Sequence, residues 1–165
     1  MPETETVERA RKAKRKGKSA STQAGEFVRE EMHHIREGKH GARSAKQAIA
    51  IGLSKARRAG VNLPPPEKGK VSEKTRRSAK RAYQAGQRAK PKPSRRRSRA
   101  TERALKREPR SAASRKALSR QARSAARKRT RTERSASARR AVQTKGRRRR
   151  SAAARKAART RASRA

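Results

Sequence analysis

Three glutamates and three histidines are concentrated in the short segment EEMHHIREGKH, where their spacing could support metal binding. In a helix, Glu30 would share a face with His33, and Glu31 with His34, and i, i+3 pairs of this kind hold metals in other helical proteins. Further ligands would have to come from a second copy of the chain, with His40 and Glu37 as candidates. The alternative is a solvated helix face with contacts between residues four apart. We favour the solvated face and therefore predict no metal and no cofactor.

Covalent catalysis has no recognisable basis in this sequence. The chain contains no Cys and no Asp, and most of its Ser residues lie among arginines rather than near a histidine. A nucleophile with an adjacent base therefore cannot be assembled. We predict that the protein is not an enzyme.

The composition argues against an extensive hydrophobic core. Leu, Ile, Val and Phe together make up 13 of 165 residues, and the formal net charge is +42. A chain so poor in bulky apolar residues and so highly charged is expected to be largely disordered. Nothing resembles a membrane span or a secretory signal. We therefore expect a location in the cytoplasm or on the nucleoid.

The positive charge is concentrated toward the C-terminus. Residues 1–66 carry 15 Lys and Arg against 7 Glu, whereas residues 67–165 carry 39 against 5. Such a density favours a polyanionic partner, because Lys and Arg that replace condensed counterions release them to bulk solvent. An anionic membrane would require a bulky apolar helix face, which the C-terminal part lacks. We therefore predict that the partner is nucleic acid and that the protein does not bind a membrane.

Composition divides the chain into five zones. Residues 1–20 form a basic N-terminal arm, 21–63 hold most of the bulky apolar residues, and 64–70 are a Pro-rich linker. Residues 71–90 are a possible helix. Residues 91–165 are low in complexity and rich in Arg, Ala and Ser, and we expect them to be disordered when free and partly helical when bound, with breaks at Pro109 and near Gly146.

The apolar residues of the second zone recur at helical spacing. They predict a two-helix hairpin over about 22–60, with Thr22 as the first N-cap and Gly38 as the first stop. Ser44 with Gln47 forms a capping box for the second helix, and Gly60 ends it. About 40 residues is marginal for an independent fold, so we expect stabilisation either by a homodimer through the hairpin or by the bound polyanion. The predicted core consists of Phe27, Val28, Met32, Ile35, Ile49 and Leu53. The predicted fold class is thus mostly α and disordered, a small hairpin followed by a long basic tail.

A helix-turn-helix is an alternative interpretation of the second helix. Ala48, Gly52, Leu53 and Ser54 match an A-x-x-x-G-L-S pattern in which the glycine makes the turn before a recognition helix. That helix would run from Ser54 to Gly60, which is short for a major groove. The competing interpretation is one continuous helix in which Gly52 permits close packing.

The hairpin also carries a family resemblance. The stretch EFVREEMHHIREGKHGARSAKQAIAIGLSKARRAG, Glu26 to Gly60, resembles the core segment of a family of small basic bacterial proteins of unassigned activity. This resemblance implies a bacterial source and no catalytic residues. The tail resembles the C-terminal domains of linker histones and bacterial histone-like proteins, although it is rich in Arg where those are usually rich in Lys.

Together these patterns predict a histone-like protein that binds duplex DNA without sequence specificity and compacts or bridges it. The alternatives are an RNA-binding or ribosome-associated protein, and a protein-interaction module that the tail merely localises. The tail has neither a rigid core to hold side chains at base edges nor aromatic residues for stacking on single strands. The residues expected to bind phosphates are Arg95, Arg96, Arg97, Arg99, Arg127, Lys128, Arg129, Arg147, Arg148, Arg149, Arg150, Arg155 and Lys156.

Overall fold

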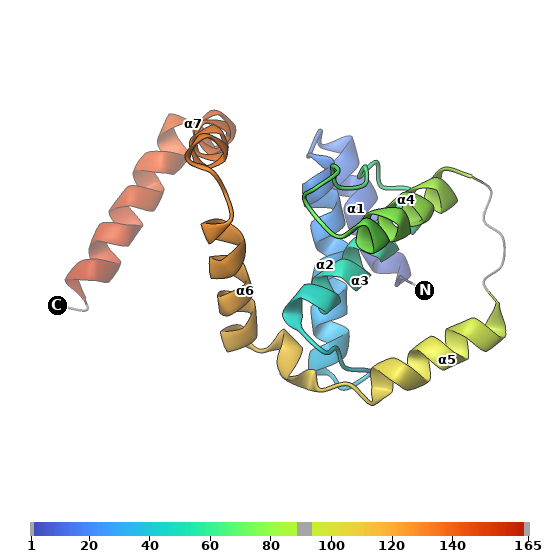
Figure 1. Cartoon of the computed structure of the whole chain (residues 1–165). Coiled ribbons are helices and arrows are strands. Elements are labelled where there is room, and N and C mark those ends of the chain that lie inside the picture. The colour runs from blue at the N-terminus through green and yellow to red at the C-terminus, as the bar shows by residue number, and fades with distance from the viewer. Residues whose placement is uncertain (1, 89–93, 164–165) are drawn as a thin grey trace. The chain divides into compact units, whose positions relative to one another are not determined.

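The structure is a computed structural model that describes residues 2–88 and 94–163, apart from the side chains of 144, 145 and 147–150. Every regular element in this described part is a helix (Figure 1). The elements are α1 (Thr4–Arg15), α2 (Ala20–Arg36), α3 (Ala45–Arg58), α4 (Glu73–Gln87), α5 (Arg95–Lys106), the 3₁₀ helix η1 (Arg110–Ala113), α6 (Arg115–Arg127) and α7 (Arg131–Ala162).

The predicted fold class, a two-helix hairpin followed by a disordered tail, is wrong. The hairpin is one part of a larger set of packed helices, and most of the described region beyond it is helical. Contacts divide the chain into two units, Met1–Gln121 and Ala122–Ala165. The expected disorder of the C-terminal region and the expected stand-alone helical hairpin are therefore both wrong.

Local sequence signals do fix the ends of α2 and α3. Ser44 caps α3 by accepting a hydrogen bond from the backbone N–H of Gln47 at 3.2 Å. Gly38 and Gly60 follow the two helices with φ of 79° and 89°, left-handed values that glycine adopts without strain. The N-cap of α2 was predicted incorrectly, because Ser19 accepts the hydrogen bond from the backbone N–H of Thr22.

The helices α2 and α3 pack against each other over two small clusters of apolar side chains. The first core contains buried Met32, Ile35, Ala42, Ala48, Ala112 and Ala113, with Val28, Ile49 and Leu118 partly buried beside it. The second core contains buried Ala10, Ala24, Phe27, Ala56 and Val61, with Val7, Ala20, Leu53, Ala59 and Leu63 beside it. All six residues of the predicted hairpin core therefore lie in these clusters.

Gly52 lets the backbones of α2 and α3 approach closely. A Cβ atom at position 52 would lie 2.7 Å from the Cα of Val28. The helix α3 runs without interruption from Ala45 to Arg58. The helix-turn-helix interpretation is therefore wrong, since the glycine serves packing and makes no turn.

Helices α1 and α4 cover the hairpin from within the same chain. Ala10 of α1 is buried in the second core, and α4 packs against α3 with Ala79 and Ala82 buried. The Tyr83 hydroxyl donates to the side-chain oxygen of Asn62 at 2.7 Å, which ties α4 to the chain after α3. These helices supply apolar cover that the sequence interpretation expected from a second copy.

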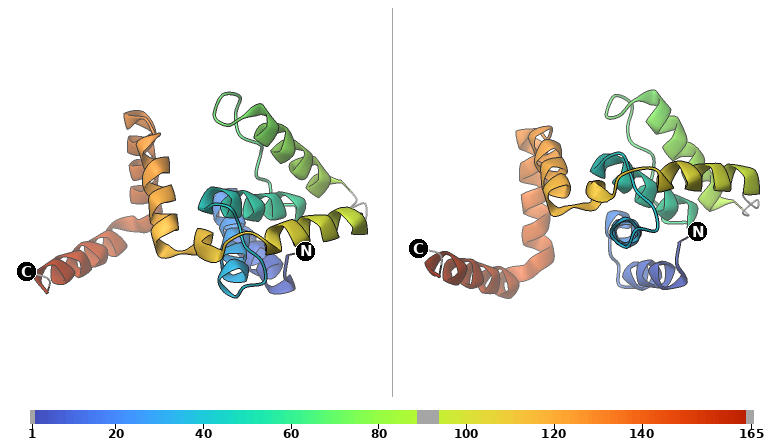
Figure 2. Two further views of the ribbon diagram at one scale, coloured as in Figure 1. Left: turned by 60° about the horizontal axis from the view of Figure 1, so that its bottom comes forward. Right: turned by 90° about the horizontal axis from the view of Figure 1, so that it is seen from below.

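A segment from the basic region docks at the loop between α2 and α3. The backbone N–H of Gly41 donates to the Leu105 carbonyl at 2.9 Å, and that of Ala42 donates to the Pro109 carbonyl at 3.1 Å. Ala112 and Ala113 of η1 are buried in the first core. Both views in Figure 2 show this gold segment beside the loop. The expected break at Pro109 is confirmed, since η1 follows it directly.

The basic region is helical because alanine propensity and caps outweigh repulsion between its arginines. Thr130 and Glu133 form a complete capping box at the start of α7. Glu102 pairs with Lys106 one turn along α5 at 2.8 Å, and this hydrogen bond lowers the pKa of Glu102. Our prediction gave like-charge repulsion too much weight, because water and salt screen exposed charges. The weak point expected near Gly146 is confirmed by a non-helical residue inside α7.

Candidate nucleic-acid interface and polar cluster

The cations of α5 form a one-sided stripe. Arg95, Arg99, Arg103 and Lys106 follow one another at intervals of four, four and three residues, which places them on one side of the helix. None of the residues described in α5 is buried. Arg96 extends the stripe on one side and Arg97 lies away from it, so three of the four residues predicted here share a face.

The cations of α6 form a second stripe at the same kind of spacing. Lys116, Arg120, Arg123 and Arg127 are exposed and recur at intervals of four, three and four residues. Leu118 lies on the opposite side of the helix, where it packs against the first core. Lys116 and Arg120, the members of the stripe in the first unit, therefore face away from the apolar cluster. Sequence reasoning selected only Arg127 from the stripe, although the spacing is visible in the sequence.

In its first part, helix α7 carries cations on several sides, because exposed Arg131, Arg134, Arg139 and Arg140 do not share one face. Gly146, with φ of 63° and ψ of 166°, interrupts the helix, so that it consists of two straight parts, 131–145 and 147–162. Arg155 and Lys156 are exposed on the second part. The side chains of Arg147, Arg148, Arg149 and Arg150 lie outside the described residues. A helix with charge on several sides has no face for an apolar core, but it can meet a polyanion from more than one direction.

The remaining predicted residues lie between these helices. Lys128 and Arg129 are exposed in the connection from α6 to α7, and the guanidinium of Arg129 donates to the hydroxyl of Ser137 at 2.7 Å. Residues 122–165 contain 18 Lys and Arg against a single Glu. This second unit is therefore a strongly cationic body in its own right.

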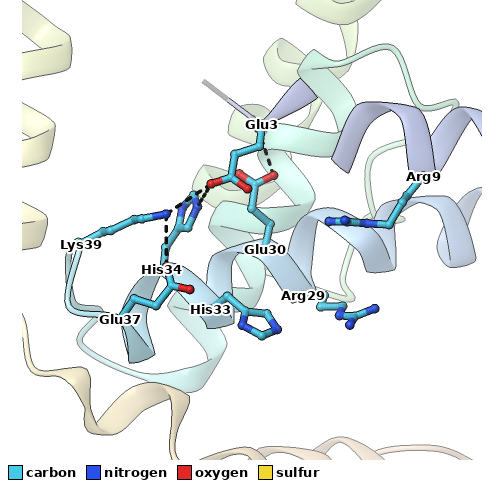
Figure 3. Close-up of a pocket in the computed structure, with 8 residues that line it drawn as sticks. All are labelled: Glu3, Arg9, Arg29, Glu30, His33, His34, Glu37 and Lys39. Atoms are coloured by element: carbon cyan, nitrogen blue, oxygen red, sulfur yellow. Dashed lines mark hydrogen bonds and ion pairs between the residues drawn. The ribbon is translucent and has the colours of Figure 1, made fainter. Parts of the chain in front are cut away.

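A second, different site gathers acidic and basic groups where α1 meets α2. Figure 3 shows the carboxylate of Glu3 beside the ring of His34 and the ammonium of Lys39. His34 Nε2 lies 2.8 Å from Glu3 Oε1, and Lys39 Nζ lies 3.3 Å from the same oxygen. These groups line a polar pocket of about 220 Å³. The hydrogen bond with His34, and then that with Lys39, lowers the pKa of Glu3.

Two buried glutamates, of which Glu30 lines this pocket, share one ammonium. Glu30 and Glu31 are 3 % and 0 % exposed. Lys55 Nζ of α3 lies 2.7 Å from Glu31 Oε2 and 3.4 Å from Glu30 Oε1. Glu30 also accepts a hydrogen bond from the backbone N–H of Glu3. Buried charges of this kind are stable only when compensating charges surround them.

Three candidate metal ligands meet within a single chain. Glu31, His34 and His40 each offer a ligand atom, and these atoms lie within 4.8 Å of one another. Sequence reasoning paired Glu31 with His34 but sought His40 in a second copy. The loop between α2 and α3 instead returns His40 to the face of α2. His33, the other histidine of the segment, is exposed.

Over the described residues these features define a helical protein in which several exposed helices are strongly cationic. Residues 11–68 match a family of unknown function, DUF6496. This match spans the end of α1, all of α2 and α3, and the Pro-rich stretch, and it is consistent with the expected resemblance to uncharacterised proteins. No curated protein and no solved structure matches the chain. None of the described helices combines the length and apolar character that crossing a membrane requires.

Proposed function

We propose that this protein binds duplex DNA through its phosphates, without sequence specificity, and compacts or bridges it. The observation that carries the proposal is the pair of cation stripes on α5 and α6, together with the charge on several sides of α7. None of the described residues of α5 and α6 is buried, and Lys116 and Arg120 lie on the side of α6 opposite Leu118, which packs on the core. Their phosphate-binding groups are therefore accessible without unfolding.

Preformed helices favour electrostatic binding over base recognition. Arg and Lys spaced along an exposed helix can each neutralise a phosphate and release counterions. Base recognition would require a few side chains held by neighbours at groove edges. The described Arg side chains of the α5 and α6 stripes are exposed and none is buried by such neighbours. Sequence preference is therefore expected to be small.

Bridging follows from the presence of basic helices in both units. The first unit carries α5 and the second carries α7, so each can hold a separate duplex. We place this activity on a bacterial nucleoid, because residues 26–60 resemble small basic bacterial proteins. RNA offers the same phosphate charge, and matched RNA belongs in every binding experiment.

The α6 stripe provides a direct test with a matched control. One variant carries Lys116→Gln, Arg120→Gln, Arg123→Gln and Arg127→Gln. The control carries Lys74→Gln, Arg77→Gln, Lys80→Gln and Arg81→Gln on α4, which removes the same charge from exposed positions. Fluorescence anisotropy with a 30-base-pair duplex should show a loss of affinity at least about tenfold larger for the α6 variant. Equal losses would show that affinity follows total charge and that the stripe is not an interface.

A further inference from the structure

The cluster of Glu31, His34 and His40 has the composition of a transition-metal site. Glu31 and His34 lie one turn apart on α2, and His40 comes from the loop before α3. The two imidazole rings meet edge to face, with centroids 6.1 Å apart and planes at 84°. Two imidazoles and one carboxylate form a common donor set for zinc and related divalent ions.

The carboxylate of Glu31 is fully buried and has few partners. Neither oxygen makes a hydrogen bond of good geometry among the described residues, although the Lys55 ammonium pairs with Oε2 at 2.7 Å. Among the described residues, its ion-pair contacts are with the Lys55 ammonium, which Glu30 shares, and with His40, while His34 lies nearby. Two buried carboxylates facing one ammonium leave negative charge at this place. A cation bound beside Glu31 would neutralise it.

The orientation of the His40 ring leaves a nitrogen for that cation. Its Nδ1 lies 3.0 Å from the Gly41 carbonyl oxygen, which can only accept, so Nδ1 carries a proton. Its Nε2 lies 3.4 Å from Glu31 Oε1. In tetrahedral coordination with bonds of about 2.0–2.1 Å, two ligand atoms stand about 3.3 Å apart. The observed separation therefore suits two ligands of one ion.

The surroundings of His34 also resemble those of a metal-bound histidine. Its Nε2 lies 2.8 Å from the Glu3 carboxylate. A carboxylate on one ring nitrogen orients the imidazole and makes the other nitrogen a better ligand. Of the three residues, His34 also lines the polar pocket of Figure 3.

We propose that Glu31, His34 and His40 bind one divalent transition-metal ion of the zinc class. Glu3 is a positioning residue that orients His34. The ion would fasten the loop between α2 and α3, because His40 adjoins Gly41 and Ala42, whose N–H groups hold the segment from Leu105 to Pro109. The site is thus a structural metal site beside the loop on which the segment from Leu105 to Pro109 docks.

The test uses the full-length chain without an affinity tag, freed of metal by a chelator and titrated with Co²⁺ and Zn²⁺. The wild type should bind one equivalent of Co²⁺ with the visible absorption of low-symmetry, nitrogen-ligated cobalt, and Zn²⁺ should displace it. His34→Gln and His40→Gln should each weaken binding by more than about tenfold. His33→Gln is the matched control, because the chain has three histidines and His33 is exposed. It should bind as the wild type does.

A second measurement decides the question even where a ligand variant fails to fold. X-ray absorption of the zinc-loaded wild type should show two imidazole ligands. Zn²⁺ should also raise the melting temperature of the wild type and His33→Gln. Absence of saturable binding, fewer than two imidazoles, or an equal loss on His33→Gln would each overturn the proposal. In those cases the contact between His40 and Glu31 is a polar side-chain contact without a metal ion.

Discussion

Gly52 of α3 lies against Val28 of α2 so closely that a Cβ atom at position 52 would come within 2.7 Å of the Val28 Cα and 3.0 Å of its Cγ2. Both contacts involve a helix backbone or a β-branched side chain, neither of which moves easily. The close approach brings Lys55 of α3 to the buried glutamates of α2. The packing of these two helices therefore also positions the polar cluster.

Replacement of this glycine should destabilise the fold. Gly52→Ala should lower the free energy of unfolding by about 1–3 kcal/mol, because the added methyl group forces α2 and α3 apart. Urea denaturation followed by circular dichroism measures the change. Gly25→Ala is the control, since a Cβ there meets nothing within 4 Å, and it should raise stability by about 0.5–1 kcal/mol through helix propensity. Similar effects of both substitutions would contradict the packing described.

The docking of the basic region at the loop makes a second prediction. A Cβ atom at Gly41 would overlap the carbonyl oxygen of Glu108. Gly41→Ala should therefore detach the segment from Leu105 to Ala113. Amide hydrogen exchange should show loss of protection at the N–H of Ala42, which donates to Pro109. Gly25→Ala should leave that amide protected, and continued protection in Gly41→Ala would refute the docking.

The kink in α7 makes a third prediction. Gly146 has a left-handed φ of 63°, which disfavours any other residue, so Gly146→Ala should restore helical geometry there. Because the chain contains no cysteine, spin labels can be placed at Ser135→Cys and Ala158→Cys alone. The variant should give a distance between backbones of about 35 Å, from 1.5 Å per residue, and the glycine form a shorter one. Equal distances would show that α7 is straight.

Helices α2 and α3 could be predicted from sequence because their signals are local. Apolar spacing, the cap at Ser44 and the stops at Gly38 and Gly60 act within a few residues. The docking of Ala112 and Ala113 could not be predicted from sequence. It depends on backbone hydrogen bonds and on two small side chains whose partners lie about 70 residues away along the chain. Alanine among arginines carries no apolar period that would reveal burial.

The candidate sites also differ in whether residue spacing in the sequence could predict them. The stripe on α6 follows from spacing alone, and a helical interpretation of residues 115–127 would have found it. The meeting of His40 with Glu31 depends on the path of the loop from Glu37 to Ser44, which residue spacing does not determine. Pairs within one helix are visible in a sequence, whereas a third ligand from a loop is not.

The four consecutive arginines of α7 make a prediction about DNA affinity. Replacing Arg147, Arg148, Arg149 and Arg150 by Ala should lower affinity for unrelated duplexes by a similar factor and leave base preference unchanged. Each phosphate contact that is lost should make the dependence on salt shallower by about one unit of slope. A loss confined to one duplex sequence would indicate base recognition by these residues.

The salt dependence of binding tests the central claim most directly. Affinity for several unrelated 30-base-pair duplexes, and for RNA of matched length, would be measured across a salt series. Engagement of roughly 10 phosphates predicts a log–log slope near −9, about equal for every duplex, with no large preference for RNA. A shallow slope with strong preference for one duplex would contradict phosphate-based binding, and a large preference for RNA would contradict the assignment of DNA as the partner.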